Sequence, residues 1–430
     1  MEITERRRDY LLFGGIYAVL AAVLFLIVEF SDIPSSVRDG YWPYADAMVS
    51  GHVFPYTEDV WAYDKWSTWE YPPLAYLFIL IPRLFSWSVS SYQAAFLAET
   101  FGFFLLGLWC SERMAVHYKV SRFGTMMFYS VLMLLMFEFL ADRFDIIPAV
   151  LTMLAVVFVL EKKNGAAFLV LAVATLVKLY PAVLFPVLLI YLLSKGDRRG
   201  ALRGAVIYCG TGLLCLGAFF AMGSDPLSFM TYHTDRPLEI EAPIASLPEF
   251  LDMLGLTDAW VGFEYGSDNL YGDMADLLGD IMLPLMAVVL LMLYAHYFYW
   301  SAMGRRKVPA KVPMDSALVA LLALMTFVLV STVFSGQYVI WLIPLMILYT
   351  MQAHAEDDRD GRSINIITWF IAVEVLTQLN FLVNFGMRGE GEDLSNIGTI
   401  VLLVRNVAAV GIYPALTWEL VKRDRFPERL

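Results

Sequence analysis

The stretch YLLFGGIYAVLAAVLFLIV, residues 10–28, decides the fold class of this chain because it carries no charged residue. An α-helix needs about 20 apolar residues to cross the roughly 30 Å hydrocarbon layer of a bilayer. Arg6, Arg7 and Arg8 precede this stretch, and it contains no small-residue cleavage site. We therefore expect a retained membrane span rather than a removable signal peptide.

Apolar runs of the same kind recur along the whole sequence. The chain is 59% hydrophobic and 17% charged, whereas soluble domains are about 45–50% apolar and about 25% charged. We predict an all-α polytopic membrane protein, a single integral domain over residues 1–430 with about 12 transmembrane helices. The predicted spans are residues 10–30, 92–112, 124–141, 146–160, 165–177, 181–194, 202–222, 277–300, 314–333, 337–352, 364–385 and 396–420.

One further apolar stretch, residues 71–87, decides the orientation. Cytoplasmic loops are enriched in Lys and Arg. If residues 71–87 do not cross, both termini and most basic residues are cytoplasmic. If they cross, every basic cluster from Arg113 onward lies outside. We therefore predict a juxtamembrane helix on the outer surface, within an outer loop at 31–91, and a second outer loop at 223–276. The basic segments are 6–8, 113–122, 162–163, 195–203, 305–311, 359–362 and 422–429.

Unusual polar residues then gather in turns that open outward. Ionisable residues at membrane depth are costly, so they are candidates for function. Simpler explanations are a local Arg143–Asp145 pair, a Lys178 side chain that reaches the membrane surface, and a polar helix contact at Gln337. The turns are Asp142-Arg143-Phe144-Asp145, Lys178-Leu179-Tyr180-Pro181, Phe334 to Trp341 with Ser335-Gly336-Gln337-Tyr338 and, in the second outer loop, Tyr232 to Glu241.

Several of these side chains suit the binding of an anion or the transfer of a proton. A guanidinium such as Arg236 grips phosphate through two hydrogen bonds, and Lys178 attracts an anion where the dielectric constant is low. His233 can exchange a proton near neutral pH. Asp39, shortly after the first span, is the preferred general base. Its chemical rivals in the same loop are Glu58, Asp59, Asp64 and Glu70.

The order of these motifs resembles the GT-C superfamily of membrane glycosyltransferases. In particular, it is similar to the polyprenol-phosphate-mannose-dependent mannosyltransferases, a family first known as a domain of unknown function. The likeness covers roughly residues 10–350. It rests on Asp39-Gly40-Tyr41 with Gly51 and Tyr56, Glu70-Tyr71-Pro72-Pro73-Leu74, Arg143-Phe144-Asp145, Lys178-Leu179-Tyr180-Pro181, His233 with Arg236-Pro237-Leu238-Glu239, and Ser335-Gly336-Gln337-Tyr338 with Trp341.

The resemblance implies an inverting glycosyltransferase that uses a sugar on polyprenyl phosphate, with mannose favoured, and a lipid or glycan acceptor. Asp39 matches the catalytic base and Lys178 a conserved lysine. Lys178, Arg236 and Arg143 are then expected to bind the donor phosphate. One departure is that Ser-Gly-Gln-Tyr stands where some members carry a histidine-containing Ser-Pro-Ile-Ser-Trp motif, so no proton relay is carried over there. Residues expected around the acceptor or behind the base are Glu70, Tyr71, Asp145, His233, Tyr180, Gln337 and Tyr338.

Two other functions stay open at this stage. Glu99, Glu138 and Glu374 lie within spans and keep a transporter or lipid flippase as the main alternative. A non-catalytic assembly subunit is the third. No Gly-rich phosphate loop predicts a nucleotide-sugar site, and the net charge of −12 argues against a nucleic-acid partner. No cluster has metal-ligand spacing, so no metal site is assigned, although a divalent metal is an alternative.

Overall fold

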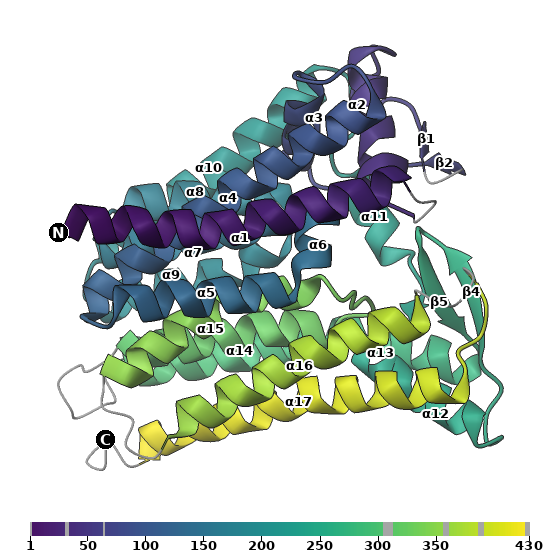
Figure 1. Ribbon diagram of the computed structural model, residues 1–430. Coiled ribbons are helices and arrows are strands. Elements are labelled where there is room, and N and C mark those ends of the chain that lie inside the picture. The colour runs from purple at the N-terminus through teal and green to yellow at the C-terminus, as the bar shows by residue number, and fades with distance from the viewer. Residues whose placement is uncertain are drawn as a thin grey trace. The chain divides into compact units, whose positions relative to one another are not determined.

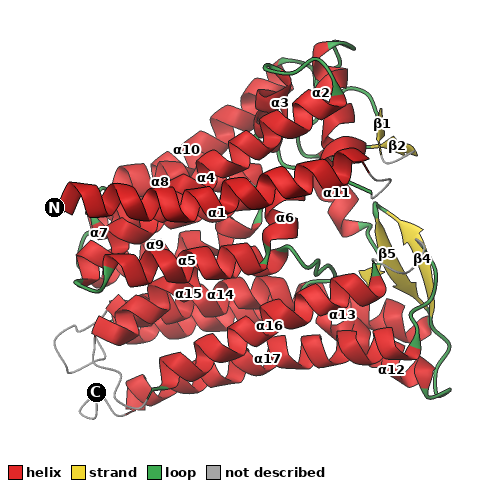
Figure 2. Ribbon diagram, viewed as in Figure 1, coloured by secondary structure: helices red, strands yellow, loops and turns green. Residues whose placement is uncertain are grey.

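The computed structural model describes residues 2–30, 34–62, 65–303, 313–355, 361–385 and 391–425. Asp64 and the basic segment 305–311, which the sequence analysis considered, lie outside the described residues. Helices dominate the described chain, and the strands form two small sheets (Figure 2). The chain divides into two compact units. Unit 1 is Met1–Ala182 with Leu202–Asp235, and unit 2 is Val183–Ala201 with Arg236–Leu430.

Unit 1 is built around the long helix α4 (Val89–Tyr118), which packs against α1 (Glu2–Phe30), α5 (Arg122–Leu135) and α7 (Ile146–Leu160) (Figure 1). Helix α7 packs in turn against α8 (Asn164–Val177). The remaining elements of this part of the chain are the π-helical turn η1 (Ser36–Tyr41), α2 (Trp42–Val49), β1 (Val60–Ala62), β2 (Lys65–Ser67), α3 (Ala75–Arg83), α6 (Phe137–Asp142), η2 (Tyr180–Val183), α10 (Arg198–Ala221) and α11 (Ser228–Thr234).

A glycine allows the close approach of α4 and α5. A Cβ atom added to Gly107 would lie 2.0 Å from the hydroxyl oxygen of Tyr129. The Tyr129 ring is fully buried, and its hydroxyl donates a hydrogen bond to the carbonyl oxygen of Phe104 at 3.4 Å. Any side chain at residue 107 would therefore displace the Tyr129 ring or push the two helices apart.

In unit 2, four helices lie side by side: α14 (Pro313–Leu329), α15 (Tyr338–Ala355), α16 (Arg362–Asn384) and α17 (Asn396–Arg425), coloured green to yellow in Figure 1. Helix α17 contacts both α14 and α16. The other elements are α9 (Leu184–Ser194), β3 (Leu238–Glu239), η3 (Pro243–Ala245), α12 (Ser246–Met253), β4 (Trp260–Glu264), β5 (Ser267–Tyr271), α13 (Asp273–Tyr297) and η4 (Phe298–Ala302).

A small antiparallel sheet in unit 2 has the strand order β3-β5-β4. Trp260 pairs with Tyr271 across β4 and β5, and their rings stack with centroids 4.3 Å apart. The rings cover Gly262, where an added Cβ would lie 2.9 Å from the Tyr271 ring. Asp393 accepts a hydrogen bond from the backbone of Val261 at 2.8 Å. This contact satisfies one backbone N–H group of the edge strand β4. The all-helical prediction did not include this sheet.

The predicted membrane fold is confirmed. Among the described residues, seven helices are long and apolar enough to cross a membrane, and five shorter apolar helices accompany them. Each predicted span coincides with one of these helices. One prediction differs in detail, because the segment 124–141 is interrupted at Met136, whose backbone leaves the helical conformation between α5 and α6.

The helix expected within residues 71–87 is α3, which follows Pro72-Pro73. Its nine residues are far fewer than the roughly 20 that cross a bilayer. The backbone N–H of Leu74 donates to the carbonyl oxygen of Leu176 at 2.9 Å, which ties the start of this helix to the end of α8. The loop segment thus lies against the turn that contains Lys178.

Candidate functional site

Asp39 lies in η1, a π-helical turn between α1 and α2. Single π-helical turns are often found at functional sites. One carboxylate oxygen of Asp39 accepts a hydrogen bond from the backbone of Ser35 at 2.8 Å, and the other pairs with Arg38 Nε at 2.9 Å. The Asp39 side chain is 39% exposed. The candidate base is therefore fixed in orientation and accessible.

Asp142, at the end of α6, binds the segment that leads into η1 and Asp39. Its carboxylate accepts hydrogen bonds from Ser35 Oγ at 2.6 Å and from the backbone of Ser36 at 2.8 Å. Helix α6 ends there because Arg143 adopts an extended backbone conformation. The sequence analysis quoted Asp142 within a motif but gave it no role, since its partners are more than 100 residues away.

Lys178 and Asp145 form a buried ion pair, with Lys178 Nζ 2.6 Å from Asp145 Oδ1. Asp145 is fully buried, and Lys178 is largely buried. Helix α8 ends at Val177, Lys178 is extended, and Pro181 follows. Pro181 has no backbone N–H to bond the carbonyl oxygen of Val177, so it disfavours continuation of the helix through this turn. Two of the predicted turns are thus brought together.

Aromatic rings surround this ion pair. Lys178 Nζ lies 4.8 Å from the centre of the Phe144 ring and 5.9 Å from that of Tyr71. The Tyr71 and Phe144 rings meet edge to face at 4.9 Å. Rings at these distances stabilise a cation, most strongly where water is excluded. Tyr71 therefore lies beside Lys178.

The buried Tyr41 lies within the influence of several charged groups of unit 1. Its ring packs against Phe144 with centroids 5.4 Å apart. Burial raises the pKa of the Tyr41 hydroxyl above its usual range, and the positive charge of Arg143 opposes this effect, whereas Asp145 adds to it. Two predicted residues, Arg143 and Asp145, are thus close enough to influence the same buried hydroxyl.

The remaining predicted residues of unit 1 are Glu70, His233 and Tyr180. His233 is exposed, and its Nε2 donates a hydrogen bond to the carbonyl oxygen of Glu70 at 3.1 Å. Tyr180 is buried beside Asp145. Unit 1 therefore contains most of the predicted site residues, and the contacts given above form three groups: Asp39 and Asp142, both bonded to Ser35; Lys178 with Asp145, Tyr71 and Phe144; and Glu70 with His233.

The other predicted residues, Arg236, Gln337 and Tyr338, belong to unit 2. Arg236 Nη2 lies 3.6 Å from Glu239 Oε1, and both side chains are buried. Gln337 is buried at the start of α15, and the Tyr338 ring stacks on Trp341 with centroids 3.8 Å apart. The two motifs are joined, because the backbone N–H of Glu239 donates to the carbonyl oxygen of Thr332 at 2.9 Å.

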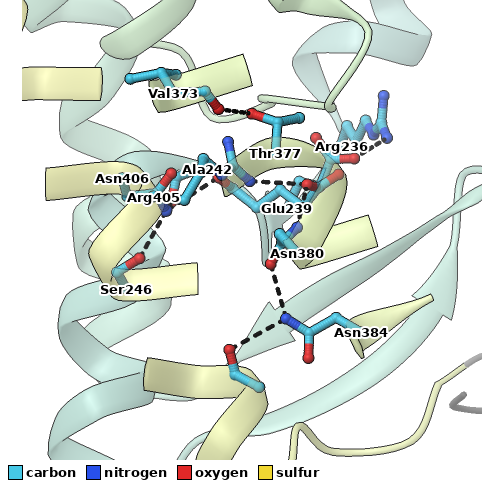
Figure 3. Close-up of polar contacts among 12 residues, drawn as sticks. Arg236, Glu239, Ala242, Ser246, Val373, Thr377, Asn380, Asn384, Arg405 and Asn406 are labelled. Carbon is cyan, nitrogen blue, oxygen red and sulfur yellow. Dashed lines mark hydrogen bonds and ion pairs between the residues drawn. The ribbon is translucent and has the colours of Figure 1, made fainter. Parts of the chain in front are cut away.

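A buried polar network behind these motifs was missed by the sequence analysis (Figure 3). Glu241 accepts hydrogen bonds from Arg405 Nη2 at 2.8 Å and from Asn380 Nδ2 at 2.9 Å. The signal was present, since Arg405-Asn406 interrupts an otherwise apolar span and Asn380 and Asn384 recur at helical spacing in α16. Among the described residues, no group of three or more His, Cys, Asp or Glu could hold a metal ion.

The fold and these charged groups define a polytopic helical membrane protein with buried ion pairs in its turns. The model of glycosyltransferase family 87 matches residues 69–331, more than half of the chain, and the chain belongs to this family. The protein is thus a membrane glycosyltransferase, in agreement with the GT-C resemblance, and this favours an enzyme over a transporter. No curated protein matches the chain significantly.

The matched region includes Glu70, Lys178 and Arg236. It leaves out Asp39, and it ends before Gln337 and Arg405. Asp39, Gln337 and Arg405 lie outside the matched region, so only their geometry and chemistry support a role for them.

Proposed function

We propose that the protein is an inverting glycosyltransferase that takes a sugar, mannose favoured, from polyprenyl phosphate and transfers it to a lipid or glycan acceptor on the outer membrane face. One observation carries the proposal. The turn Asp142–Asp145 supports both a candidate base and a candidate cation, since Asp142 binds the Asp39 segment and Asp145 binds Lys178. A base and a cation held by one short turn suit a displacement that releases phosphate.

Asp39 is the base in this proposal. It removes the proton from an acceptor hydroxyl, whose oxygen attacks the anomeric carbon from the face opposite the phosphate. The bond to the phosphate oxygen breaks as the new glycosidic bond forms, and the anomeric configuration inverts. The contacts of Asp39 with Ser35 and Arg38 fix the carboxylate orientation before the acceptor arrives.

Lys178, Arg236 and Arg143 stabilise the departing phosphate. The leaving group gains negative charge in the transition state, and fixed cations lower the barrier most where water is scarce. Asp145 keeps Lys178 in one position, and the rings of Tyr71 and Phe144 shield it from water. Glu70, His233, Tyr180, Gln337 and Tyr338 are proposed to contact the acceptor or to support these groups.

The proposed orientation places both termini in the cytoplasm and the catalytic residues outside. It rests on the distribution of basic residues, which favours the cytoplasmic side. The donor is a lipid, so its phosphate lies at the membrane surface beside the charged turns. The proposed partners are thus the polyprenyl-phosphate sugar, a lipid or glycan acceptor and the surrounding membrane lipids.

The test is sugar transfer by the purified full-length protein from labelled polyprenyl-phosphate mannose to a total lipid extract of the source cells. Asp39→Asn is expected to lower kcat by about 100-fold or more, the usual contribution of a general base. Asp46→Asn is the matched control. Asp46 lies in the same loop, is 38% exposed and pairs with Arg83 at 3.1 Å.

Each outcome bears on a different part of the proposal. Loss of transfer in Asp39→Asn but not in Asp46→Asn supports both the reaction and the base. Equal activity of wild type and Asp39→Asn keeps the enzyme and removes Asp39 as the base. No turnover of mannose, glucose or pentose donors by the folded wild type contradicts the polyprenyl-phosphate donor.

A further inference from the structure

Four charged side chains are buried together in unit 2: Arg236, Glu239, Glu241 and Arg405. Their side chains are between 0 and 10% exposed. Moving a charge out of water costs several kcal/mol, and apolar residues of similar volume often stabilise a protein as well or better. Stability alone therefore does not explain why these charges are buried here, and we look for a function that requires them.

Arg405 is the most deeply buried of the four. From α17, its Nη2 donates to Glu241 Oε1 at 2.8 Å, and its guanidinium lies 4.4 Å above the centre of the Phe334 ring. Its Nε and Nη1 atoms have no hydrogen-bond partner among the described residues. Arg405 thus contacts two segments at once: it binds Glu241 in one and stacks on the Phe334 ring in the other. This position leaves some of its N–H groups without hydrogen bonds to the described residues, which costs free energy.

Neighbouring amides also bind Glu241. Asn380 of α16 donates to its carboxylate at 2.9 Å, and Asn384 donates to Asn380 at 2.8 Å. From α17, Asn406 donates to the carbonyl oxygen of Glu241 at 3.3 Å and to Ser246 at 2.7 Å. Two long helices therefore fix both the side chain and the backbone of this residue.

Arg405 contacts two segments, residues 236–242 and 334–338, and both contain predicted site residues. Residues 236–242 contain Arg236, which lies against Glu239. Residues 334–338 contain Gln337 and Tyr338, and this turn starts at Phe334, whose ring lies under Arg405. Displacement of Arg405 would release both segments from a common support.

We propose that Arg405 is a positioning residue that acts through Glu241 and Phe334, and that it sets the place of Arg236 relative to the turn of Gln337 and Tyr338. This inference rests on the proposed function, in which Arg236 binds the donor phosphate. It assigns a role to α17, a helix beyond the region that the family model matches.

The experiment uses the double variant Glu241→Gln/Arg405→Met in the purified full-length protein. Removing both charges avoids an unpaired buried ion, so the variant is expected to fold with a Tm near that of the wild type. The readouts are the KM for polyprenyl-phosphate mannose, kcat, and the Ki of polyprenyl phosphate as a product inhibitor. We expect KM and Ki to rise about 10- to 100-fold, because a small misplacement of a binding group has effects of this size.

The matched control is Arg362→Met/Glu419→Gln. It removes a different ion pair, which joins the start of α16 to the C-terminal part of α17 with a distance of 2.6 Å. This variant should keep the wild-type KM and Ki. Conservative replacement by Arg405→Lys should restore only part of the affinity, because an ammonium lacks the planar surface that stacks on Phe334.

A double-mutant cycle with Arg236→Gln separates positioning from general damage. If Arg405 acts through Arg236, adding Glu241→Gln/Arg405→Met to Arg236→Gln causes little further loss. Additive losses, or an unchanged KM in a folded double variant, would overturn the inference while wild-type transfer stands. Failure of the wild type to transfer the sugar or bind polyprenyl phosphate would instead overturn the proposed function and this inference with it.

Discussion

Ser35 and Asp142 are joined by a hydrogen bond of 2.6 Å between Ser35 Oγ and Asp142 Oδ1, across 107 positions of the sequence. Ser35 also donates its backbone N–H to Asp39. One serine thus connects a carboxylate that supports the loop to the carboxylate proposed to act as base.

The first prediction concerns Asp142. Asp142→Ala removes the acceptor for Ser35 and Ser36, so the turn that contains Asp39 loses its anchor. We expect kcat to fall by about 10- to 100-fold with little change in the donor KM, because the base is displaced and the phosphate site is not. Steady-state kinetics with labelled donor measure both constants.

Asp142→Asn keeps one acceptor oxygen and should recover part of kcat. The control is Asp197→Ala, which removes a similar acceptor from the start of α10. An equal loss in the control, or a rise in the donor KM with an unchanged kcat, would refute the positioning role of Asp142.

The second prediction concerns the Lys178–Asp145 pair. Lys178→Met leaves the fully buried Asp145 without its cation, and we expect a loss of about 3–5 kcal/mol in the free energy of unfolding. The double variant Lys178→Met/Asp145→Leu should recover most of this stability without recovering transfer. Denaturant unfolding in detergent, beside the transfer assay, measures the two effects separately.

Lys163 offers the matched comparison, since it pairs with Glu161 at 2.7 Å but is well exposed. Lys163→Met should cost less than about 1 kcal/mol. Recovery of both stability and transfer in the double variant at Lys178 and Asp145 would show that the pair is structural.

The third prediction is a pH dependence of stability. Burial raises the pKa of Glu241 to about 7, against the opposing attraction of Arg405, and the nearby Glu239 and Asp268 add to the rise. The folded protein therefore binds this proton more tightly than the unfolded chain, whose glutamates have a pKa near 4.5. This contribution to stability is complete below about pH 4.5 and is lost as the pH rises through about 7.

Tm measured between pH 5 and pH 8 tests this dependence. The wild type should lose stability over this range, and Glu241→Gln should show a flatter profile because glutamine does not titrate. A steeper loss in the variant, or identical profiles, would contradict the assignment to Glu241.

The fourth prediction concerns helix packing in unit 1. Gly107→Ala places a methyl group 2.0 Å from the Tyr129 hydroxyl, so α4 and α5 must separate or the ring must move. We expect a loss of about 1–3 kcal/mol in the free energy of unfolding. Gly102→Ala in the same helix meets no atom within 4 Å and should be tolerated. Equal thermal stability of both variants would rule out this close contact.

The membrane fold could be predicted because it depends on length and hydropathy, which are local properties of the sequence. Residues 10–28 became part of α1, and the Pro72-Pro73 segment led into a helix too short to cross. The strands β4 and β5 were missed because their pairing depends on the ring stack of Trp260 and Tyr271 over Gly262, which short alternating runs did not reveal.

The sequence singled out several turns as candidates for chemistry but did not indicate how they pair. Lys178 and Asp145 were both chosen, and a local Arg143–Asp145 pair was considered as a simpler explanation. The structure shows Lys178 bonded to Asp145 from 33 residues away. Such partners follow from tertiary packing of α7 on α8, which no single segment encodes.

The contact between Glu241 and Arg405 also has a consequence for how the protein is made. Arg405 is synthesised 164 residues after Glu241, which at roughly 5–20 residues per second is a delay of about 8–33 s. During that interval Glu241 lacks its contact with Arg405, so we expect residues 236–242 to reach their final place only after α17 has been made. A chain released before α17 is therefore expected to be inserted but inactive.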